Sequence, residues 1–462
     1  MFSYAQQIRR ATTASFAVLL IAFSVPGSAQ DATSSLFGQF SGSKHKPVTL
    51  TLKDALALAE KNDPSVLAAA ADAATAHEDR QQAKSALYPS LSGRSEYLGT
   101  QGNGVLPQGR FVTNDGVHVY REWAVVHQDL SPGSLNGIGV RRAAATEALA
   151  RAKLQIAQRG LASTVTRDYY TLIVAQRKYG TAQTALDQAR QSLDISRKLE
   201  SGREVAHSDV VRSELLENSQ EQALQEAKLA MENARLDLAV LLFRDFDEDF
   251  SVVDDLNVAP VLPPVTDAEN MAAHANPTLA AAIESLRGSS LDVKIARQAF
   301  LPTLSVDAVY GIEANSVGMR TTVAAAPFAG PVPNLGYFVT ASLNIPVWDW
   351  GIRHSKLKQT EFKRDVAEAD VSAAQRTLVR NFRGAYDEAQ LARQQLDALR
   401  RAVDLGSETL RLNTLRYQAG EATIVELLDA QTSFIQTRNA YDDGQLRYRV
   451  AIANLQTLTG RF

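Results

Sequence analysis

The chain has 462 residues, and its 48 Lys and Arg residues against 51 Asp and Glu residues give a net charge of −3, which excludes a generally basic nucleic-acid-binding protein. It contains no cysteine, which excludes disulfide scaffolds, zinc–thiolate and iron–sulfur sites, cysteine nucleophiles and a lipid anchor on an N-terminal cysteine. With 45% apolar and 21% charged residues, the composition is that of a globular protein.

The first residues have the pattern of an export signal. A pair of arginines precedes the apolar residues 14–25, and small residues precede a cleavage site after Ala29. We expect a signal peptide over 1–29 and an N-terminal extension over 30–47, with an uncleaved N-terminal anchor as the alternative. No later segment approaches the run of apolar residues that a membrane-spanning helix needs.

Two long stretches of the chain lack proline. No proline lies between Pro132 and Pro260, and none follows Pro346. Because proline interrupts helices, these stretches predict two long helices, over 139–200 and 352–417. At a rise of 1.5 Å per residue each helix would be about 90 to 100 Å long, which exceeds a compact domain.

One sequence pattern occurs twice. Pro89 lies in Ala-Leu-Tyr-Pro-Ser-Leu-Ser and Pro302 in the similar Ala-Phe-Leu-Pro-Thr-Leu-Ser, and each is preceded at the same spacing by another proline. Gly139 corresponds to Gly351 at the start of the long helix. These matches indicate an internal repeat.

The chain is therefore expected to be mainly helical, with a small β part. We expect repeat 1 over 48–243, an equatorial linker over 244–264 and repeat 2 over 265–460. Each repeat would contain, in order, a helix, two strands, a very long helix, a tight turn and a further helix. Gly202 and Gly420 would lie in the two tight turns.

The first helix of each repeat is expected as one unbroken element, over 52–88 and 267–300. The second long helix carries two apolar series with a seven-residue step, which lie about 140° apart around the helix. They are Leu391, Ala398, Leu405 and Leu412, and Leu396, Val403, Leu410 and Tyr417. Two seams predict a neighbour on each side, as in the wall of a tube, whereas a simple rod would need only one.

Alternating apolar and polar residues predict strands at about 90–99, 117–130, 304–314 and 337–347. Strands of about ten residues with one apolar and one polar face are typical of an outer-membrane barrel wall, although a half-buried soluble strand has the same pattern. In 117–130 the faces are ambiguous, because Arg121 alternates in phase with Trp123.

Four strands cannot close a membrane barrel, because the smallest barrels have about eight. Other chains must therefore pair with the outer strands. Two subunits would supply eight strands and three would supply twelve.

Over about 48–460 the duplicated pattern resembles the TolC family of outer-membrane efflux and secretion channels. The segments that carry the resemblance are Pro346-Val-Trp-Asp-Trp-Gly-Ile-Arg353 and Arg416-Tyr-Gln-Ala-Gly-Glu-Ala-Thr-Ile-Val-Glu-Leu-Leu-Asp-Ala-Gln431. The resemblance implies a homotrimer in which twelve strands form one barrel in outer-membrane lipid and twelve helix columns form a tunnel through the periplasm. It also implies a periplasmic adaptor protein and an inner-membrane transporter as partners.

By the same resemblance, Glu426 and Asp429 match the acidic ring at the periplasmic entrance of the channel. Six carboxylates around one axis would favour cations and bind multivalent ions. The alternative is local, because Thr423-Ile-Val-Glu426 is also a capping box and acids at a helix start are stabilised by its dipole.

Tyr417 and Asp209 match family positions in the links that hold the entrance closed. A hydrogen bond from the phenol to the carboxylate could be exchanged for water when an adaptor docks. The chain departs from the family pattern at Ala422, where the best-known pattern has a basic residue, so a salt bridge there is not expected. The alternative for Tyr417 is packing at the end of its apolar seam.

The passage from the last strand to the second long helix contains Pro346, Trp348, Asp349 and Gly351. Family geometry places this passage near the periplasmic rim of the barrel, where the tryptophan would suit an interfacial belt. Packing of the strand against the helix is the alternative.

The sequence gives no support for an enzyme. The histidines have no metal-ligand spacing, and no nucleophile-elbow or phosphate-loop motif is present. We therefore expect no catalytic residue, cofactor or resident metal. The favoured function is a passive exit duct in the outer membrane of a Gram-negative bacterium, and the alternative is a periplasmic coiled-coil adaptor or scaffold without a pore. The resemblance leaves the cargo open among drugs, metal ions, polysaccharides and secreted proteins.

Overall fold

A computed structural model describes residues 48–99, 118–243, 249–314 and 334–460. Apart from Asp249, these residues belong to one compact unit, Val48–Arg244 with Phe250–Phe462. The expected signal peptide and N-terminal extension lie outside the described residues, as do the centres of both loops that join paired strands.

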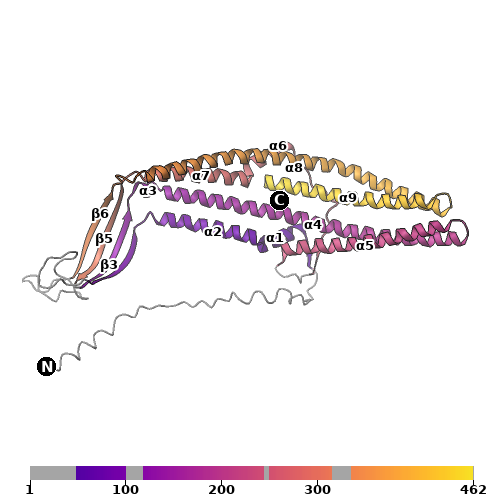
Figure 1. The fold of residues 1–462 in the computed structure, drawn as a ribbon, viewed down its shortest axis with the longest axis horizontal. Helices are drawn as coiled ribbons and strands as arrows, with labels where there is room; N and C mark the ends of the chain where they lie inside the picture. The colour runs from indigo at the N-terminus through magenta and orange to yellow at the C-terminus, as the bar shows by residue number, and fades with distance from the viewer. Residues whose placement is uncertain (1–47, 100–117, 244–248, 315–333, 461–462) are drawn as a thin grey trace, which may run out of the picture. The chain divides into compact units, whose positions relative to one another are not determined.

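Helices dominate the described unit, with one four-stranded and one two-stranded sheet among the described residues (Figure 1). In chain order the elements are β1 Val48–Leu50, α1 Leu52–Asn62, α2 Pro64–Ser85, β2 Ser90–Gly99, β3 His118–Asp129, α3 Pro132–Leu135, α4 Ile138–Ser201, α5 His207–Leu242, β4 Phe250–Val252, α6 Val265–Ala275, α7 Pro277–Gln298, β5 Thr303–Ala314, β6 Leu335–Asn344, α8 Ile352–Gln418 and α9 Ile424–Thr459.

The two longest helices, α4 and α8, have 64 and 67 residues. At a rise of 1.5 Å per residue each is therefore about 95 to 100 Å long. Neither contains a proline, which would interrupt the helix. The shorter α2 and α5 lie along different parts of α4, while α7 and α9 lie along different parts of α8 (Figure 1). Two short helices thus cover the length of each long one, and α4 also packs against α7 and α9.

The helices before the strands are broken in two, and the expectation of one unbroken helix over 52–88 and over 267–300 was wrong. Asp63 ends α1 in extended backbone and caps α2 by accepting the amide protons of Ser65 and Val66, both at 2.9 Å. Asn276 does the same between α6 and α7. A residue before proline disfavours helical backbone, while proline itself is well tolerated in the first turn of a helix.

The residue that corresponds to Gly351 at the start of a long helix is Gly137, and the predicted correspondence of Gly139 with Gly351 was wrong. Gly137 and Gly351 are the N-cap residues, with φ of 57° and 85°. Gly139 lies inside α4. Left-handed backbone explains why a glycine is placed before each helix.

The four-stranded sheet is antiparallel throughout, in the order β2-β3-β5-β6. The pairing of β3 with β5 joins strands that lie far apart in the chain, for example Val125 with Val309. Among the described residues β2 and β6 are the outer strands.

The register assigns the ambiguous strand to its two faces. Arg121 and Trp123 lie on the face that carries Glu96, Asp307 and other polar residues of the neighbouring strands. On this face Arg121 bridges Glu96 at 2.9 Å and Glu313 at 3.1 Å. One arginine therefore pairs with carboxylates of both neighbouring strands on this face.

The opposite face of the sheet is largely apolar and exposed, although it also carries Glu122, which accepts a hydrogen bond from Ser95 at 2.6 Å. Its large side chains include Leu91, Tyr310, Tyr337, Val339 and Leu343, and each is more than half exposed. Monomeric soluble proteins rarely expose a continuous apolar surface of this kind, so it indicates contact with a partner or a lipid phase.

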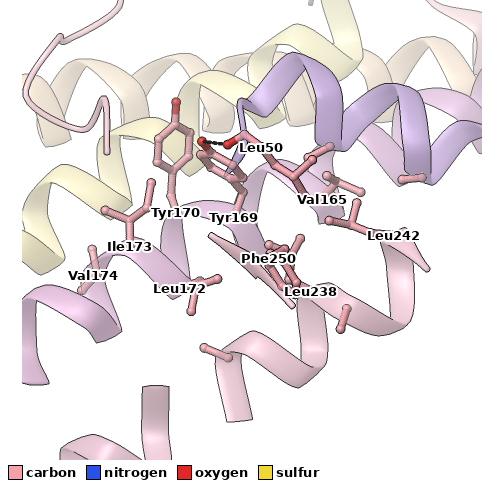
Figure 2. Close-up of a cluster of buried hydrophobic side chains, with 14 of the residues drawn as sticks. Leu50, Val165, Tyr169, Tyr170, Leu172, Ile173, Val174, Leu238, Leu242 and Phe250 are labelled. Atoms are coloured by element: carbon pink, nitrogen blue, oxygen red, sulfur yellow. Dashed lines mark hydrogen bonds between the residues drawn. The ribbon is translucent and has the colours of Figure 1, made fainter. Parts of the chain in front are cut away.

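The principal core surrounds the middle of α4 (Figure 2). Tyr169, Tyr170, Leu172 and Ile173 are each about 1% exposed. At 3.6 residues per turn these four side chains spread over roughly half of the helix surface, so α4 is buried over a broad face here, while Arg167 stays exposed. Leu238 and Leu242 of α5 and Phe250 of β4 complete this core.

The two-stranded sheet was not expected from the sequence. β1 and β4 pair in parallel, with Leu50 opposite Val252. Their backbone is tied to α4 by Tyr169, whose hydroxyl donates to the carbonyl oxygens of Leu50 at 3.1 Å and Val253 at 2.8 Å. Burial of the phenol, together with the nearby carboxylate of Asp255, raises the pKa of Tyr169 to about 12.

Candidate functional site

The first candidate site is the pair of turns that join α4 to α5 and α8 to α9. At the end of α4 the amide of Arg203 donates to Glu200 O at 2.8 Å and that of Glu204 to Leu199 O at 2.9 Å. This is a Schellman motif. The predicted turn residue Gly202 lies in this turn with right-handed backbone, and the left-handed position is Arg203, with φ of 62°.

The second turn has the same hydrogen bonds. The amide of Gly420 donates to Tyr417 O at 3.1 Å, and that of Glu421 to Arg416 O at 2.8 Å. Here the predicted glycine occupies the left-handed position, with φ of 74°. The two turns are thus equivalent in backbone geometry, but the left-handed position is occupied by Arg203 in the first turn and by Gly420 in the second.

The two predicted ring residues lie one turn apart at the start of α9, and both are exposed. The Thr423 hydroxyl accepts the amide proton of Glu426 at 3.4 Å and contacts its carboxylate at 3.3 Å. A guanidinium nitrogen of Arg416 lies 3.4 Å from the same carboxylate. Glu426 therefore takes part in helix capping, while Asp429 projects from the next turn.

Tyr417 is 2% exposed and lies where the α8–α9 hairpin meets the α4–α5 hairpin. Its hydroxyl is 2.9 Å from Ser196 Oγ, which is also 3.0 Å from Ser213 Oγ. Within one chain the phenol therefore pairs with a serine of α4. Asp209 is partly exposed in the first turn of α5.

A second buried contact crosses between the hairpins nearby. Gln431 of α9 donates from Nε2 to Ser192 Oγ of α4 at 2.8 Å. Ser192, Ser196 and Ser213 are each no more than 4% exposed. Sequence reasoning missed this polar seam, although Ser192 and Ser196 share a face of α4 at the spacing of one helical turn.

The passage into α8 is organised by Asp349. Its carboxylate accepts the amide protons of Gly351 at 3.1 Å and Arg353 at 3.0 Å, which satisfies amides that the helix leaves free. Trp348 and Trp350 pack edge to face, with ring centroids 5.8 Å apart. Both rings are largely exposed, and Pro346 lies between the end of β6 and the two tryptophans, outside any strand or helix.

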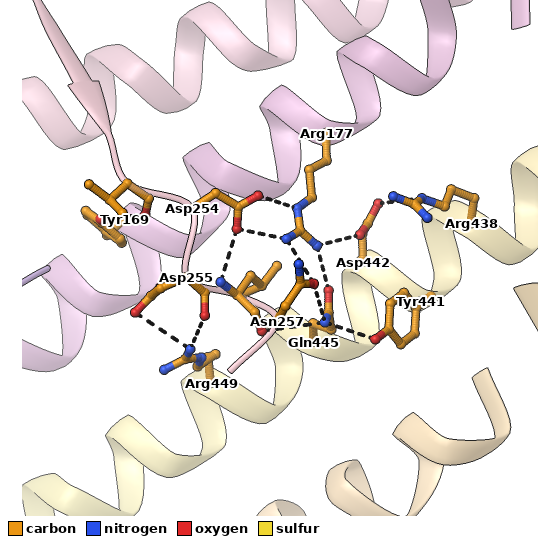
Figure 3. A network of polar contacts seen from close by, with 12 residues as sticks. Tyr169, Arg177, Asp254, Asp255, Asn257, Arg438, Tyr441, Asp442, Gln445 and Arg449 are labelled. Carbon is orange, nitrogen blue, oxygen red and sulfur yellow. Dashed lines mark hydrogen bonds and ion pairs between the residues drawn. The ribbon is translucent and has the colours of Figure 1, made fainter. Parts of the chain in front are cut away.

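A polar junction that sequence reasoning also missed lies beside the core, where the segment after β4 crosses α4 and α9 (Figure 3). Arg177 of α4 donates two hydrogen bonds to the carboxylate of Asp254, at 2.7 and 2.8 Å. Its remaining nitrogen donates to Asp442 at 3.1 Å and Gln445 at 2.8 Å of α9. One guanidinium thus joins three segments that are far apart in the sequence.

The two carboxylates of this junction respond differently to it. Burial alone would raise the pKa of Asp254, but hydrogen bonds from Arg177 and from the Leu256 amide bring it below its ordinary value. Burial dominates at Asp442, which is fully buried, and its pKa stays above the ordinary value despite Arg177 and Arg438.

Among the described residues, no group of three or more His, Asp or Glu side chains is placed to hold a metal ion. In the same part of the chain no helix has the length and apolar character needed to cross a membrane.

The sequence is similar to known outer-membrane proteins. A sequence profile of the outer membrane efflux proteins matches residues 269–461. Outer membrane protein OprJ of Pseudomonas aeruginosa is 25% identical over 295 residues, which are 63% of this chain and 54% of that protein. Outer membrane protein TolC of Escherichia coli is 25% identical over 169 residues, which are 36% of this chain and 34% of that protein. The matched segments thus span about half or less of these relatives.

Solved structures share the fold over most of the chain. The outer-membrane protein VceC of Vibrio cholerae aligns with a TM-score of 0.75 at 17% identity, covering 89% of this chain and 96% of that one. The outer-membrane channel CmeC of Campylobacter jejuni aligns with a TM-score of 0.74 at 18% identity, covering 88% and 85%.

Proposed function

Because this chain belongs to the TolC family of outer membrane efflux proteins, we propose that it is a passive exit duct in the outer membrane of a Gram-negative bacterium. The duct passes cargo from an inner-membrane transporter and a periplasmic adaptor protein to the exterior. The observation that carries this proposal is the sheet with one exposed apolar face and one charged face, continued by helices about 100 Å long.

The sheet supports assembly as a homotrimer. Three copies would supply twelve strands, enough for a closed barrel, and closure would pair β6 of one copy with β2 of the next. The apolar face would then meet lipid, and the face with Arg121 and Glu313 would line a water-filled interior.

The repeated order of elements supports a helical tunnel built from two similar halves, repeat 1 over 48–243 and repeat 2 over 265–460. In each half the long helix forms one column, and the two shorter helices that lie along it together form a second. With two halves in each chain, three chains would contribute twelve helix columns.

We place the periplasmic entrance at the α8–α9 turn, with Glu426 and Asp429 as an acidic ring. Their exposure in one chain supports this placement, since six carboxylates around the axis would face the solvent of the pore. The capping role of Glu426 is compatible with the ring, because the cap is formed by its backbone amide, and its carboxylate stays exposed beside Thr423 and Arg416.

A closed-state latch between Tyr417 and Asp209 of neighbouring hairpins is proposed as well. The phenol already has a buried partner in Ser196, so the latch requires a change of partner. Replacing Tyr417 with Phe is expected to raise conductance, and unaltered conductance would discredit the latch.

The experiment that tests the duct is conductance of the purified protein in planar bilayers. We expect a trimer that only detergent extracts from outer membranes and that forms cation-preferring pores. Replacing Glu426 and Asp429 with Ala should weaken block by multivalent cations, whereas the equal charge change at Glu78 and Asp79, exposed on α2, should leave block unchanged. Well-folded trimers without conductance would count against the duct.

The alternative, a periplasmic adaptor or scaffold, makes the opposite prediction, because it would fractionate as a soluble protein and form no pore. The exposed apolar face of the sheet favours the duct, since a soluble scaffold would have to cover it.

A further inference from the structure

A cavity of about 260 Å³ lies where the segment between β4 and α6 passes over α8 and α9. Asn257 of that segment, Arg393 and Arg400 of α8, and Tyr441 and Arg449 of α9 lie in its wall. Two of these walls, the segment with Asn257 and helix α9 with Tyr441 and Arg449, also hold residues of the polar network drawn in Figure 3. The cavity itself has no part in the proposed duct.

The charge of the wall is positive. Three arginines line the cavity against one acid, Asp397. Arg393 and Arg400 lie two helical turns apart on one face of α8, so both guanidinium groups are presented to the same side. Arginine is the side chain best suited to hold phosphate and carboxylate groups, because its donors form a planar fork.

Arg449 is held in place before any ligand arrives. Its side chain is 13% exposed, and its guanidinium stacks over the ring of Tyr170 at 4.6 Å. One terminal nitrogen donates to Asp255 O and Val258 O, both at 2.6 Å. Its Nε is buried without a hydrogen-bond partner.

The nearby carboxylates offset only part of this charge. Asp254 and Asp442 are engaged by Arg177 on the other side of the junction. Asp255 forms an ion pair with Arg449 at 3.8 Å and balances part of its charge, but it lies outside the cavity wall. Asp397 therefore remains the one acid in the wall itself.

We propose that this cavity binds a small anion that carries at least two negative charges on phosphate or carboxylate groups. Such a ligand would contact α8, α9 and the segment between β4 and α6 at once. It would thereby fasten that segment to the helices whose far ends form the α8–α9 turn.

The test is calorimetric titration of the full-length protein in detergent with sodium pyrophosphate, against sodium chloride at equal ionic strength. Saturable binding of pyrophosphate, and not of chloride, is expected. Parallel titrations with inorganic phosphate and citrate distinguish phosphate from carboxylate chemistry. Absence of saturable binding by all of these anions would overturn the proposal.

Variants on neighbouring residues of α8 localise the site. Asp397→Asn removes the one negative charge of the wall and should tighten binding severalfold, a gain that damage to the fold would not produce. Arg400→Glu should weaken binding at least tenfold. Arg401→Glu, an exposed residue outside the cavity wall, is the control and should change binding little. Equal weakening by both charge reversals would indicate a non-specific effect and reject the site.

Discussion

Arg203 and Gly420 occupy the same left-handed position after a long helix, with φ of 62° and 74°. A side chain in this backbone costs about 1 kcal/mol relative to glycine, because Cβ crowds the carbonyl oxygen. Arg203→Gly should therefore raise the free energy of unfolding by up to about 1 kcal/mol, and Gly420→Ala should lower it by a similar amount. Urea denaturation followed by circular dichroism measures both.

The control for this pair is Gly202→Ala. Gly202 has φ of −77°, and a Cβ there would meet only ordinary contacts. Its replacement should be neutral or slightly stabilising. A loss at Gly202 as large as the loss at Gly420 would show that the turns need glycine for a reason other than backbone handedness.

Glu147 is a buried carboxylate of α4 with three basic partners. His77 and Arg80 lie 2.8 and 2.9 Å away, and Arg151 pairs with it from the next turn. Hydrogen bonds from His77 and then Arg80 lower the pKa of Glu147 to about 2. Because the folded-state pKa lies below the unfolded value, its stabilisation is complete above about pH 4.5 and is lost as the pH falls towards 2.

Glu147→Gln should accordingly lower stability at pH 7 and flatten the pH dependence of the urea midpoint between pH 4.5 and 2. Glu78→Gln, an exposed acid of α2, is the matched control. An unchanged pH profile in Glu147→Gln would mean that other carboxylates cause the loss at acid pH.

A single side chain of α4, Arg177, contacts both α9 and the segment after β4. Its removal would leave Asp442, which is fully buried, without its closest cation. Removing one partner of a buried ion pair typically costs about 3 to 5 kcal/mol. Arg177→Met should therefore destabilise the protein by this order, and Asp442→Asn in that background should restore part of the loss.

Lys178→Met provides the comparison at the adjacent residue. Lys178 pairs with Asp443 at 2.7 Å, but that carboxylate is about half exposed, so the loss should stay below about 1 kcal/mol. Purely additive effects of Arg177→Met and Asp442→Asn in unfolding titrations would refute the coupling.

At the scale of elements, features with a periodic signal could be predicted from the sequence. The absence of proline after Pro346 predicted a long helix where α8 lies, and alternation over 304–314 predicted a strand where β5 lies. The breaks at Asp63 and Asn276 could not be predicted, because the proline that follows each residue is compatible both with the end of one helix and with the first turn of another. β4 has three residues, too few for any period to be visible.

Contacts between elements could not be predicted in the same way. Thr423 and Glu426 were recognisable as a cap because they are neighbours in the chain. The pairing of Tyr417 with Ser196, and of Arg177 with Asp442, depends on how three helices, α4, α8 and α9, are rotated against one another. No local pattern encodes that rotation.

For the whole molecule, the two faces of the sheet provide the sharpest test of its setting. Val339 and Thr340 are adjacent in β6 and point to opposite faces, Val339 to the apolar one. A lysine facing lipid costs about 2 to 4 kcal/mol near the middle of a bilayer, whereas one facing the interior costs little. Val339→Lys should therefore reduce the trimer recovered from outer membranes severalfold, and Thr340→Lys should not. Equal recovery of the two variants would contradict a lipid-facing sheet.

The unlike outer strands of the sheet have a genetic consequence. β2 and β6 have different sequences. A ring in which β6 of one copy pairs with β2 of the next therefore has heterologous interfaces, with a different surface on each side. A chain with only β6 blocked could still be incorporated through β2, and it would leave a gap in every ring that accepted it. In the proposed homotrimer, random mixing of normal and blocked chains made in equal amounts would leave only about one ring in eight intact, so a single defective allele would act as a dominant-negative.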